Sequence, residues 1–452
     1  MIMKKRFMLV LAFLSACNFI SFAAENAATY LLENKIPVYV KNIEDSEFAA
    51  VCLVFKGGTR YLTPQTSGLE ENCLTLLSMG SKNYSYDSLK TFCYEKCSSL
   101  SNFSVEEGSV FKMECISRYF DETFLRFEDV FFNPLFSQKE YDLLRTSLSQ
   151  TVQRMQNDPE SMIFYSMDTV LYQDHPFAAK VSVTPESIEN ITLDAIKKYY
   201  ASLFDSRRIS FVASGNIDAQ KLVSMLNRSF GKIQAGKNSL RDFDVPPLNL
   251  KGEPVVLVSP GASGASFIAR VFPSPAVTDP DYVPSRIVAS IFSGILHNVV
   301  REKNGICYTP FTTVMSSDAP YGFEYLYRAT NLTDFSRVMD ESRKILEEGK
   351  TISSVDSSGN YIYEPVSSRL EGYVNSYITS KYKSQTSVGG ISTRMAASLL
   401  QFGDVTTGDE LTAIARKTTA DDIVRVFKKY WLSEESRWFA VVGPGEEDKI
   451  QF

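Results

Sequence analysis

Histidine is nearly absent from this sequence of 452 residues. Only His175 and His297 occur, and they lie far apart in the chain. This scarcity excludes every zinc-peptidase motif built from two histidines on one helix, including His-Glu-x-x-His and its inverse. His175 stands before Pro176 in a predicted loop and His297 on a predicted helix. A lone histidine is more often a structural or surface residue than a metal ligand.

An excess of positive charge is also missing. Lysine and arginine together number 47 against 53 acidic residues, so the formal net charge is −6. Nucleic-acid binding calls for a basic face opposite the phosphate backbone, and this balance argues against it. Beyond the first residues we expect no stretch long and apolar enough to span a membrane.

The first 23 residues predict an export signal. Lys4, Lys5 and Arg6 precede a short apolar core, Phe7–Phe13. This pattern is typical of a secretory signal, which is removed and takes no part in the fold. Leu14-Ser15-Ala16-Cys17 resembles a bacterial lipobox and makes Cys17 a lipidation candidate, whereas Ser21-Phe22-Ala23 offers an ordinary cleavage site. We therefore expect an exported protein of the periplasm or cell envelope, with or without a lipid anchor.

Cysteine is too sparse for a disulfide scaffold. Apart from Cys17, six cysteines occur in the chain. Cys93 and Cys97 are four residues apart on a predicted helix, and no second pair of cysteines or histidines lies nearby to complete a zinc site. We expect the six to be small buried hydrophobic residues, although one disulfide stays open in an exported protein.

The chain length predicts two or more domains. We expect an N-terminal domain over 25–234, a polar, proline-containing linker over 235–252 and a C-terminal domain over 253–452. In the first domain, the pattern predicts a hairpin from residue 30, further strands and helices. The expected elements are strands over 30–32, 36–40, 48–55, 109–116 and 208–215, and helices over 68–77, 86–100, 119–131 and 138–156.

The second half repeats features of the first. Thr192 and Thr419 each precede a helix that carries Lys-Lys-Tyr, and each helix is followed by an apolar strand that ends in glycine. A similar strand also occurs early in each half, at 51–55 and 267–272. Two matches in the same order predict an internal duplication of two α+β domains.

Three stretches resemble the pitrilysin/insulinase family of zinc peptidases, the inverzincins, and relatives of the mitochondrial processing peptidase type. The first is Gly57-Gly-Thr-Arg60 with the segment 67–77, the second is Asp174-His-Pro-Phe177 leading into 188–192, and the third is Val300–Tyr308. The third is close to the family signature Arg-Glu-Lys-x-Gly-Leu-x-Tyr. The resemblance implies two tandem α+β domains of the processing-peptidase type, arranged as a half-shell.

The zinc motif of that family is absent from this sequence. The family motif His-x-x-Glu-His places two zinc ligands on one side of a helix, with the glutamate as general base. Counted from Gly68, the histidine positions fall on Glu71 and Thr75, and the glutamate position falls on Leu74. Leucine cannot accept a proton. We interpret Glu70 and Glu71 as acidic residues of the first helical turn, where negative charge interacts favourably with the helix dipole.

The distal ligand of the family is missing as well. No acidic residue occurs from 143 to 157, where Gln150 and Thr151 hold the expected place. We therefore expect no metal site and no catalytic residue in this chain, with zinc only in a partner chain. Gly389-Gly390 is shorter than the glycine-rich loop of the non-catalytic processing-peptidase subunit and lies elsewhere, so we read it as a turn.

The third motif is intact. We expect Arg301 in the last turn of a helix that starts near Arg286, Gly305 to end that helix in a left-handed conformation, and Tyr308 to begin the next strand. The resemblance implies that Arg301 and Tyr308 bind peptide across the chamber from the zinc of another half-shell. The alternative is structural, with Arg301 paired to an acid and Tyr308 capping a core.

The sequence thus predicts an exported, non-catalytic family member that binds peptide and completes the chamber of a zinc-bearing insulinase-family partner as a heterodimer. Self-association is the other mode of assembly. One rival is a stand-alone peptide-binding or scaffold protein of the cell envelope. A further rival is a zinc metallopeptidase, as the family label implies. We expect no nucleic-acid partner, and membrane contact only through a lipid anchor.

Overall fold

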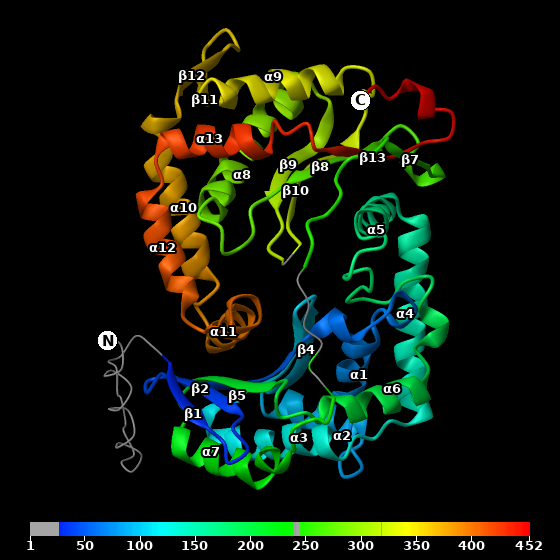
Figure 1. The fold of residues 1–452 in the computed structure, drawn as a ribbon, viewed down its shortest axis with the longest axis vertical. Coiled ribbons are helices and arrows are strands. Elements are labelled where there is room, and N and C mark those ends of the chain that lie inside the picture. The colour runs from blue at the N-terminus through cyan, green and yellow to red at the C-terminus, as the bar shows by residue number, and fades with distance from the viewer. Residues whose placement is uncertain (1–26, 239, 241–244, 318) are drawn as a thin grey trace, which may run out of the picture.

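The computed structural model describes residues 27–238, 240, 245–317 and 319–452 (Figure 1). The predicted signal segment, 1–23, and the lipidation candidate Cys17 lie outside the described residues. So does part of the predicted linker, 235–252.

The first domain is built on a six-stranded sheet with the order β1-β2-β6-β3-β5-β4. Neighbouring strands are antiparallel except β2 and β6, which are parallel. The strands are β1 Ala28–Leu31, β2 Pro37–Asn42, β3 Phe48–Lys56, β4 Ser99–Val105, β5 Gly108–Ile116 and β6 Ile209–Gly215. The helices of this half are α1 Leu69–Leu77, α2 Tyr86–Glu95, α3 Phe120–Phe132, α4 Gln138–Asn157, α5 Pro159–Leu171, α6 Leu193–Tyr200 and α7 Ala219–Arg228.

The second domain has a five-stranded sheet with the order β7-β13-β8-β10-β9 and a separate hairpin of β11 and β12. Its strands are β7 Val255–Val258, β8 Ser266–Pro273, β9 Cys307–Val314, β10 Tyr321–Ala329, β11 Lys350–Val355, β12 Tyr361–Pro365 and β13 Arg437–Val442. Its helices are α8 Tyr282–Leu296, a π-helix His297–Lys303, α9 Phe335–Glu347, α10 Leu370–Lys383, α11 Val388–Phe402, α12 Thr407–Lys417 and α13 Ala420–Tyr430.

The two sheets share one topology. The series β2-β6-β3-β5-β4 in the first has the same order and the same strand directions as β7-β13-β8-β10-β9 in the second. Thr192 and Thr419 cap α6 and α13, each accepting a hydrogen bond from the backbone three residues on. The predicted α+β fold with two tandem homologous domains is confirmed.

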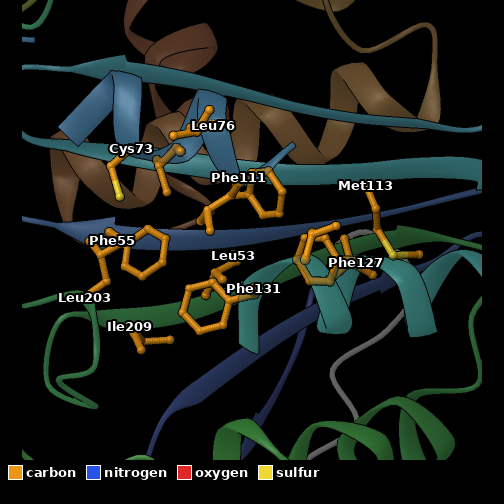
Figure 2. Close-up of a cluster of buried hydrophobic side chains, with 14 of the residues drawn as sticks. Leu53, Phe55, Cys73, Leu76, Phe111, Met113, Phe127, Phe131, Leu203 and Ile209 are labelled. Carbon is orange, nitrogen blue, oxygen red and sulfur yellow. The ribbon is translucent and has the colours of Figure 1, made fainter. Parts of the chain in front are cut away.

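Apolar residues fill both faces of the central strands. In β3, Val51, Leu53 and Phe55 pack into one core, while Cys52 and Val54 belong to a second core on the opposite face. Such a strand reads as a continuous apolar run, because neither face meets water. Figure 2 shows the first core, where side chains of β3, β5, α1 and α3 interdigitate.

Each domain covers the second face of its sheet with a helix from the other half of the chain. Met395, Ala396 and Leu399 of α11 pack against the first sheet. Ile163 and Met167 of α5 pack against the second. Figure 1 accordingly shows the domains joined by α4 and α5 on one side and by α10, α11 and α12 on the other. The domains are therefore interlocked and do not simply follow one another.

Three local predictions are wrong. The helix expected over 86–100 ends at Glu95, because Cys97 adopts a left-handed φ of 46° and Ser99 begins the edge strand β4. Cys97 is also exposed, unlike the buried cysteines 52, 73, 115 and 307. Gly389 and Gly390 lie in the first turn of α11, not in a turn between elements, and Ser387 caps that helix by accepting from the Gly390 N–H at 3.0 Å.

Within the part of the chain that the structure describes, one helix meets the length and composition of a membrane span, contrary to expectation. It runs over Tyr282–Lys303, and 67% of its most apolar window is buried inside the protein. Its side chains pack against β8, β10, α9 and α13 in the core of the second domain. A helix in the centre of a core is surrounded by other elements, so its side chains are apolar on every face.

Candidate functional site

The site begins at α1, which occupies the place of the metal helix. Gly68 caps this helix with φ 80°, and a Cβ there would lie 2.5 Å from the Val183 backbone nitrogen. Glycine is therefore required on both conformational and steric grounds. Glu70 anchors this helix to the rest of the domain. Its carboxylate pairs with Arg208 at 2.9 Å and accepts hydrogen bonds from Ser109 and Tyr199. Glu70 thus has a buried structural role as well as a favourable place near the helix dipole.

The three predicted metal-motif positions lie together on this helix. Leu74 is fully buried in the core of the first domain. The Thr75 hydroxyl donates to the Glu71 carbonyl oxygen at 2.9 Å, and Asn102 Nδ2 donates to the same carbonyl at 3.3 Å. Burial raises the pKa of the Glu71 carboxyl above its ordinary value of 4.5, although a hydrogen bond from Ser182 lowers it.

These residues do not fit a zinc ion. A catalytic zinc site needs three protein ligands that present nitrogen, sulfur or carboxylate oxygen. Here Leu74 offers no lone pair, Thr75 is engaged with the helix backbone, and Glu71 is the single carboxylate of the motif. Among the described residues, no group of three or more His, Cys, Asp or Glu side chains could hold a metal ion.

The distal candidates lie on α4. Thr151 Oγ1 donates to the Ser147 carbonyl at 3.2 Å and accepts from Arg154 Nη2 at 3.3 Å. Gln150 is exposed and lines an open cleft together with Gln153, Arg154 and Asn157. Neither side chain supplies a carboxylate.

Arg301 and Tyr308 are brought together, as the motif spacing predicts. The Arg301 guanidinium carbon lies 4.9 Å from the centroid of the Tyr308 ring, within the range of a cation–π contact. The Arg301 side chain is 37% exposed and Tyr308 is 63% exposed. Tyr308 therefore does not cap a core. Its role in peptide binding stays a prediction.

The helix–turn–strand segment that joins Arg301 to Tyr308 differs from the expected one in the type of helix. Arg301 lies in a π-helical segment, His297–Lys303, that continues α8, and such segments often occur at functional sites. Gly305 ends it with φ 58°, and its N–H donates to the Arg301 carbonyl at 3.0 Å. The left-handed glycine stop is confirmed, and Tyr308 is the second residue of β9.

The structural alternative expected an acid partner for Arg301, and Glu302 is that partner, whereas the contact with His297 was not predicted. Arg301 Nε lies 3.3 Å from Glu302 Oε1, and Arg301 Nη1 lies 3.4 Å from His297 Nε2. His297 and Glu302 are 3.8 Å apart. The i, i+4 spacing of His297 and Arg301 on a helix could have indicated this contact. Burial raises the pKa of the adjacent Cys307 to about 12, although Arg301 acts to lower it.

Sequence reasoning also missed Asn102 and Arg208, which bond to residues of α1 and keep that helix in place. Asn102 lies on β4, 31 residues from Glu71, and Arg208 lies just before β6, 138 residues from Glu70. No spacing rule connects them to Glu70 or Glu71 in the sequence. Packing of β4 and of the segment before β6 against α1 brings them there.

Comparison with known proteins agrees with this architecture. Residues 38–184 match the family model "Insulinase (Peptidase family M16)", and residues 190–351 match "Peptidase M16 inactive domain". The Helicobacter pylori protein "Non-peptidase homolog YmxG" is 21% identical over 357 residues, covering 75% of this chain and 82% of that protein. A Rickettsia felis "Uncharacterized zinc protease" is 19% identical over 426 residues, covering 93% and 98%.

A solved structure shows the same fold at greater length. The periplasmic protease PqqL from Escherichia coli superposes with a TM-score of 0.74 at 16% identity, covering 93% of this chain but 46% of that one. This chain thus corresponds to about half of PqqL. With matching family models over both halves of the duplicated fold, the chain belongs to the insulinase family of peptidases, family M16, as a member without the zinc motif.

Proposed function

We propose that this chain is an exported, non-catalytic M16 subunit that binds peptide and completes the active chamber of a zinc-bearing partner of the same family. The observation that carries the proposal is a difference between two sites of the chain, the metal-motif positions and the Arg301–Tyr308 pair. The metal-motif positions hold a buried leucine and an engaged threonine, whereas the Arg301–Tyr308 pair is assembled and exposed. The zinc of the complex would then belong to the partner.

The chemistry of the pair suits a peptide backbone. A guanidinium and a phenol hydroxyl both donate hydrogen bonds to carbonyl oxygens, most strongly where negative charge develops during hydrolysis. Stacking on the Tyr308 ring orients the Arg301 guanidinium and leaves part of it exposed. The pair therefore acts as a binding wall and supplies neither a base nor a metal ligand.

The relatives support a two-shell arrangement. This chain spans 46% of PqqL, so one PqqL chain has room for two such units. A heterodimer with a zinc-bearing chain would supply the second half, and self-association is the alternative mode. The name of YmxG, a non-peptidase homolog, supports an inactive subunit.

The decisive experiment is reconstitution with a zinc-bearing M16 chain from the same organism, followed by peptide turnover. Arg301→Ala should lower turnover about ten- to a hundredfold, equivalent to about 1.4–2.7 kcal/mol of lost substrate or transition-state contact. Tyr308→Phe deletes only the hydroxyl, so any fall in peptide turnover of this variant measures the loss of a hydrogen bond. Arg337→Ala, at an exposed arginine of α9, is the matched control.

Three results would redirect the proposal. Wild-type turnover by both site variants would make the pair structural. Peptide binding without any zinc-bearing partner in envelope extracts would favour the stand-alone scaffold. Stoichiometric zinc in the purified chain, with activity lost to a chelator, would favour a zinc protease, the name that the Rickettsia felis relative carries.

Export is part of the proposal. PqqL is a periplasmic protein, and the first residues carry a signal pattern. If Cys17 is lipidated, Cys17→Ser should move the mature chain from the membrane fraction to the soluble fraction. Unchanged fractionation, together with a mature N-terminus at Ala24, would favour ordinary cleavage after Ala23.

A further inference from the structure

His297 is a titratable neighbour of the Arg301–Tyr308 pair. Its Nε2 lies 3.4 Å from Arg301 Nη1, and the same guanidinium stacks on the Tyr308 ring at 4.9 Å. The side chain of His297 is 49% exposed, so protons from solvent reach it. Histidine ordinarily changes its charge between pH 5 and 8, whereas arginine stays charged throughout this range. A change of charge on His297 therefore acts directly on Arg301.

The π-helical segment His297–Lys303 places a second group beside His297. In an α-helix, the residue five positions on lies about 140° round the axis and points elsewhere. The i→i+5 turn of a π-helix brings that residue back beside the first. Glu302, five positions after His297, accordingly has its Oε1 3.8 Å from His297 Nε2 and 3.3 Å from Arg301 Nε. The π-helix thus gathers an imidazole, a guanidinium and a carboxylate on one face.

The protonation state of His297 decides which of these contacts is favourable. With its proton on Nδ1, the neutral ring accepts a hydrogen bond at Nε2 from Arg301 Nη1, while Glu302 pairs with Arg301 Nε. The guanidinium is then held on two sides and stays over the Tyr308 ring. Protonation makes Nε2 a donor, so this hydrogen bond is lost and two positive charges face each other. The imidazolium also competes with Arg301 for Glu302 Oε1.

Charged and titratable side chains also approach this region from neighbouring elements. They are Cys307 and Tyr308 of β9, Glu341 of α9, Tyr361 of β12 and Tyr373 of α10. Phenols and thiols ordinarily keep their protons between pH 5 and 8, and carboxylates are ordinarily ionised there. Glu341 is also engaged by Lys303, with Nζ and Oε1 2.6 Å apart. Between pH 5 and 8, the change of charge among these groups therefore comes from His297.

We propose that His297 is a positioning residue, which holds the Arg301 guanidinium over Tyr308 while the imidazole is neutral and releases it on protonation. Peptide binding is then pH-dependent, stronger at about pH 7.5 than at about pH 5.5. His297 acts through Arg301 and needs no contact of its own with the peptide. This inference rests on the proposed function, because it concerns the regulation of the same peptide-binding pair.

Turnover of a fluorogenic peptide by the reconstituted complex, at about pH 7.5 and about pH 5.5, tests the regulation. At each pH, kcat/KM is divided by that of the Arg301→Ala complex, so that titrating groups of the zinc-bearing partner cancel. We expect the wild-type ratio to fall about fivefold at the lower pH, the usual loss of one hydrogen bond. His297→Gln keeps an acceptor that does not titrate, so its ratio should stay high at both pH values, whereas that of His297→Ala should be low at both.

Histidine NMR of the untagged mature chain tests the positioning without peptide or partner. The sequence holds two histidines, so labelled histidine gives two ring signals, which the variant His175→Gln assigns. Arg301→Gln removes a like charge and should move the pH titration of the His297 signal to higher pH by about half a unit, whereas Glu302→Gln should move it to lower pH. The His175 signal is the internal control and should not move. His175→Gln should also keep the wild-type pH dependence of turnover.

Two results would overturn the positioning role. One is a His297 titration that neither Arg301→Gln nor Glu302→Gln changes, whatever the turnover data are. The other is a turnover ratio with the same pH dependence in His297→Gln as in the wild type, which would assign the titrating group elsewhere. A wild-type ratio of one at every pH would instead refute the proposed function. In that case, a His297 signal that shifts in both variants still supports the positioning of Arg301.

Discussion

Glu70 and Arg208 form an ion pair of 2.9 Å in which the side chains are only 3% and 2% exposed. Arg208 also stacks 3.9 Å from the centroid of the Tyr61 ring and donates to the Lys56 carbonyl at 2.8 Å. The pair ties α1 to the end of β3 and the start of β6. The helix that would carry zinc in an active peptidase is thus anchored by a carboxylate beside the motif.

Removal of one partner of this pair should destabilise the first domain strongly. Arg208→Met leaves the Glu70 carboxylate buried without its counter-charge, and such changes cost about 3–5 kcal/mol. Urea denaturation measures the loss. Arg207→Met is the control, because Arg207 is more exposed and pairs with Asp205 at the surface. The double variant Glu70→Met/Arg208→Met should recover part of the stability. A single variant as stable as the wild type would refute a structural role for the pair.

The interlocking helices should couple the stabilities of the domains. Leu399→Ala on α11 removes a side chain that is 1% exposed and packs on the other domain's sheet. Such truncations cost about 2–5 kcal/mol, and we expect unfolding to separate into two calorimetric transitions. Leu143→Ala on α4, at a side chain 52% exposed, should change little. A single, unshifted transition for Leu399→Ala would contradict the coupling.

Glu71 predicts a specific pH dependence of stability. Burial raises its pKa above the ordinary 4.5, so the folded protein binds this proton more tightly than the unfolded chain does. The corresponding stability is fully present below pH 4.5 and is lost as the pH rises through the raised pKa. Glu71→Gln mimics the protonated form. It should therefore match the wild type at low pH and exceed it at neutral pH, as measured by denaturation at several pH values. A constant difference across that range would contradict the assignment.

Restoring the zinc motif should not restore activity. The triple variant Glu71→His, Leu74→Glu, Thr75→His still lacks the distal carboxylate, since Gln150 and Thr151 hold that region. Leu74 is also fully buried, and an unpaired carboxylate there costs several kcal/mol or stays protonated. We expect a destabilised chain with little peptide hydrolysis, measured by calorimetry and a fluorogenic peptide assay. The double variant Glu71→His, Thr75→His keeps Leu74, so the difference in stability between it and the triple variant measures the cost of burying the glutamate. Strong zinc-dependent hydrolysis by the triple variant would show that another residue supplies the missing ligand.

Much of the fold could be predicted from local signals. The apolar run at 48–55 forms β3, and Thr192 and Thr419 cap their helices through their hydroxyls. Gly305 stops its helix in the left-handed region. These features depend on residues close together in the chain, where propensity and capping act. The helix expected over 86–100 fails where Cys97 turns the chain with a left-handed φ into the β4–β5 hairpin, and the turn expected at Gly389-Gly390 fails where α11 packs against the sheet of the first domain.

The sequence by itself determined which residues stand at the metal positions, since no fold can turn Leu74 into a base or supply the absent histidines. It also determined the duplication and the spacing of Arg301 and Tyr308. Tertiary structure alone decided that Leu74 is buried and that α5 and α11 each cover the other domain's sheet. The physical reason is distance along the chain. Val54 and Leu399 are brought together by packing between domains, and neither residue carries a local signal of the other.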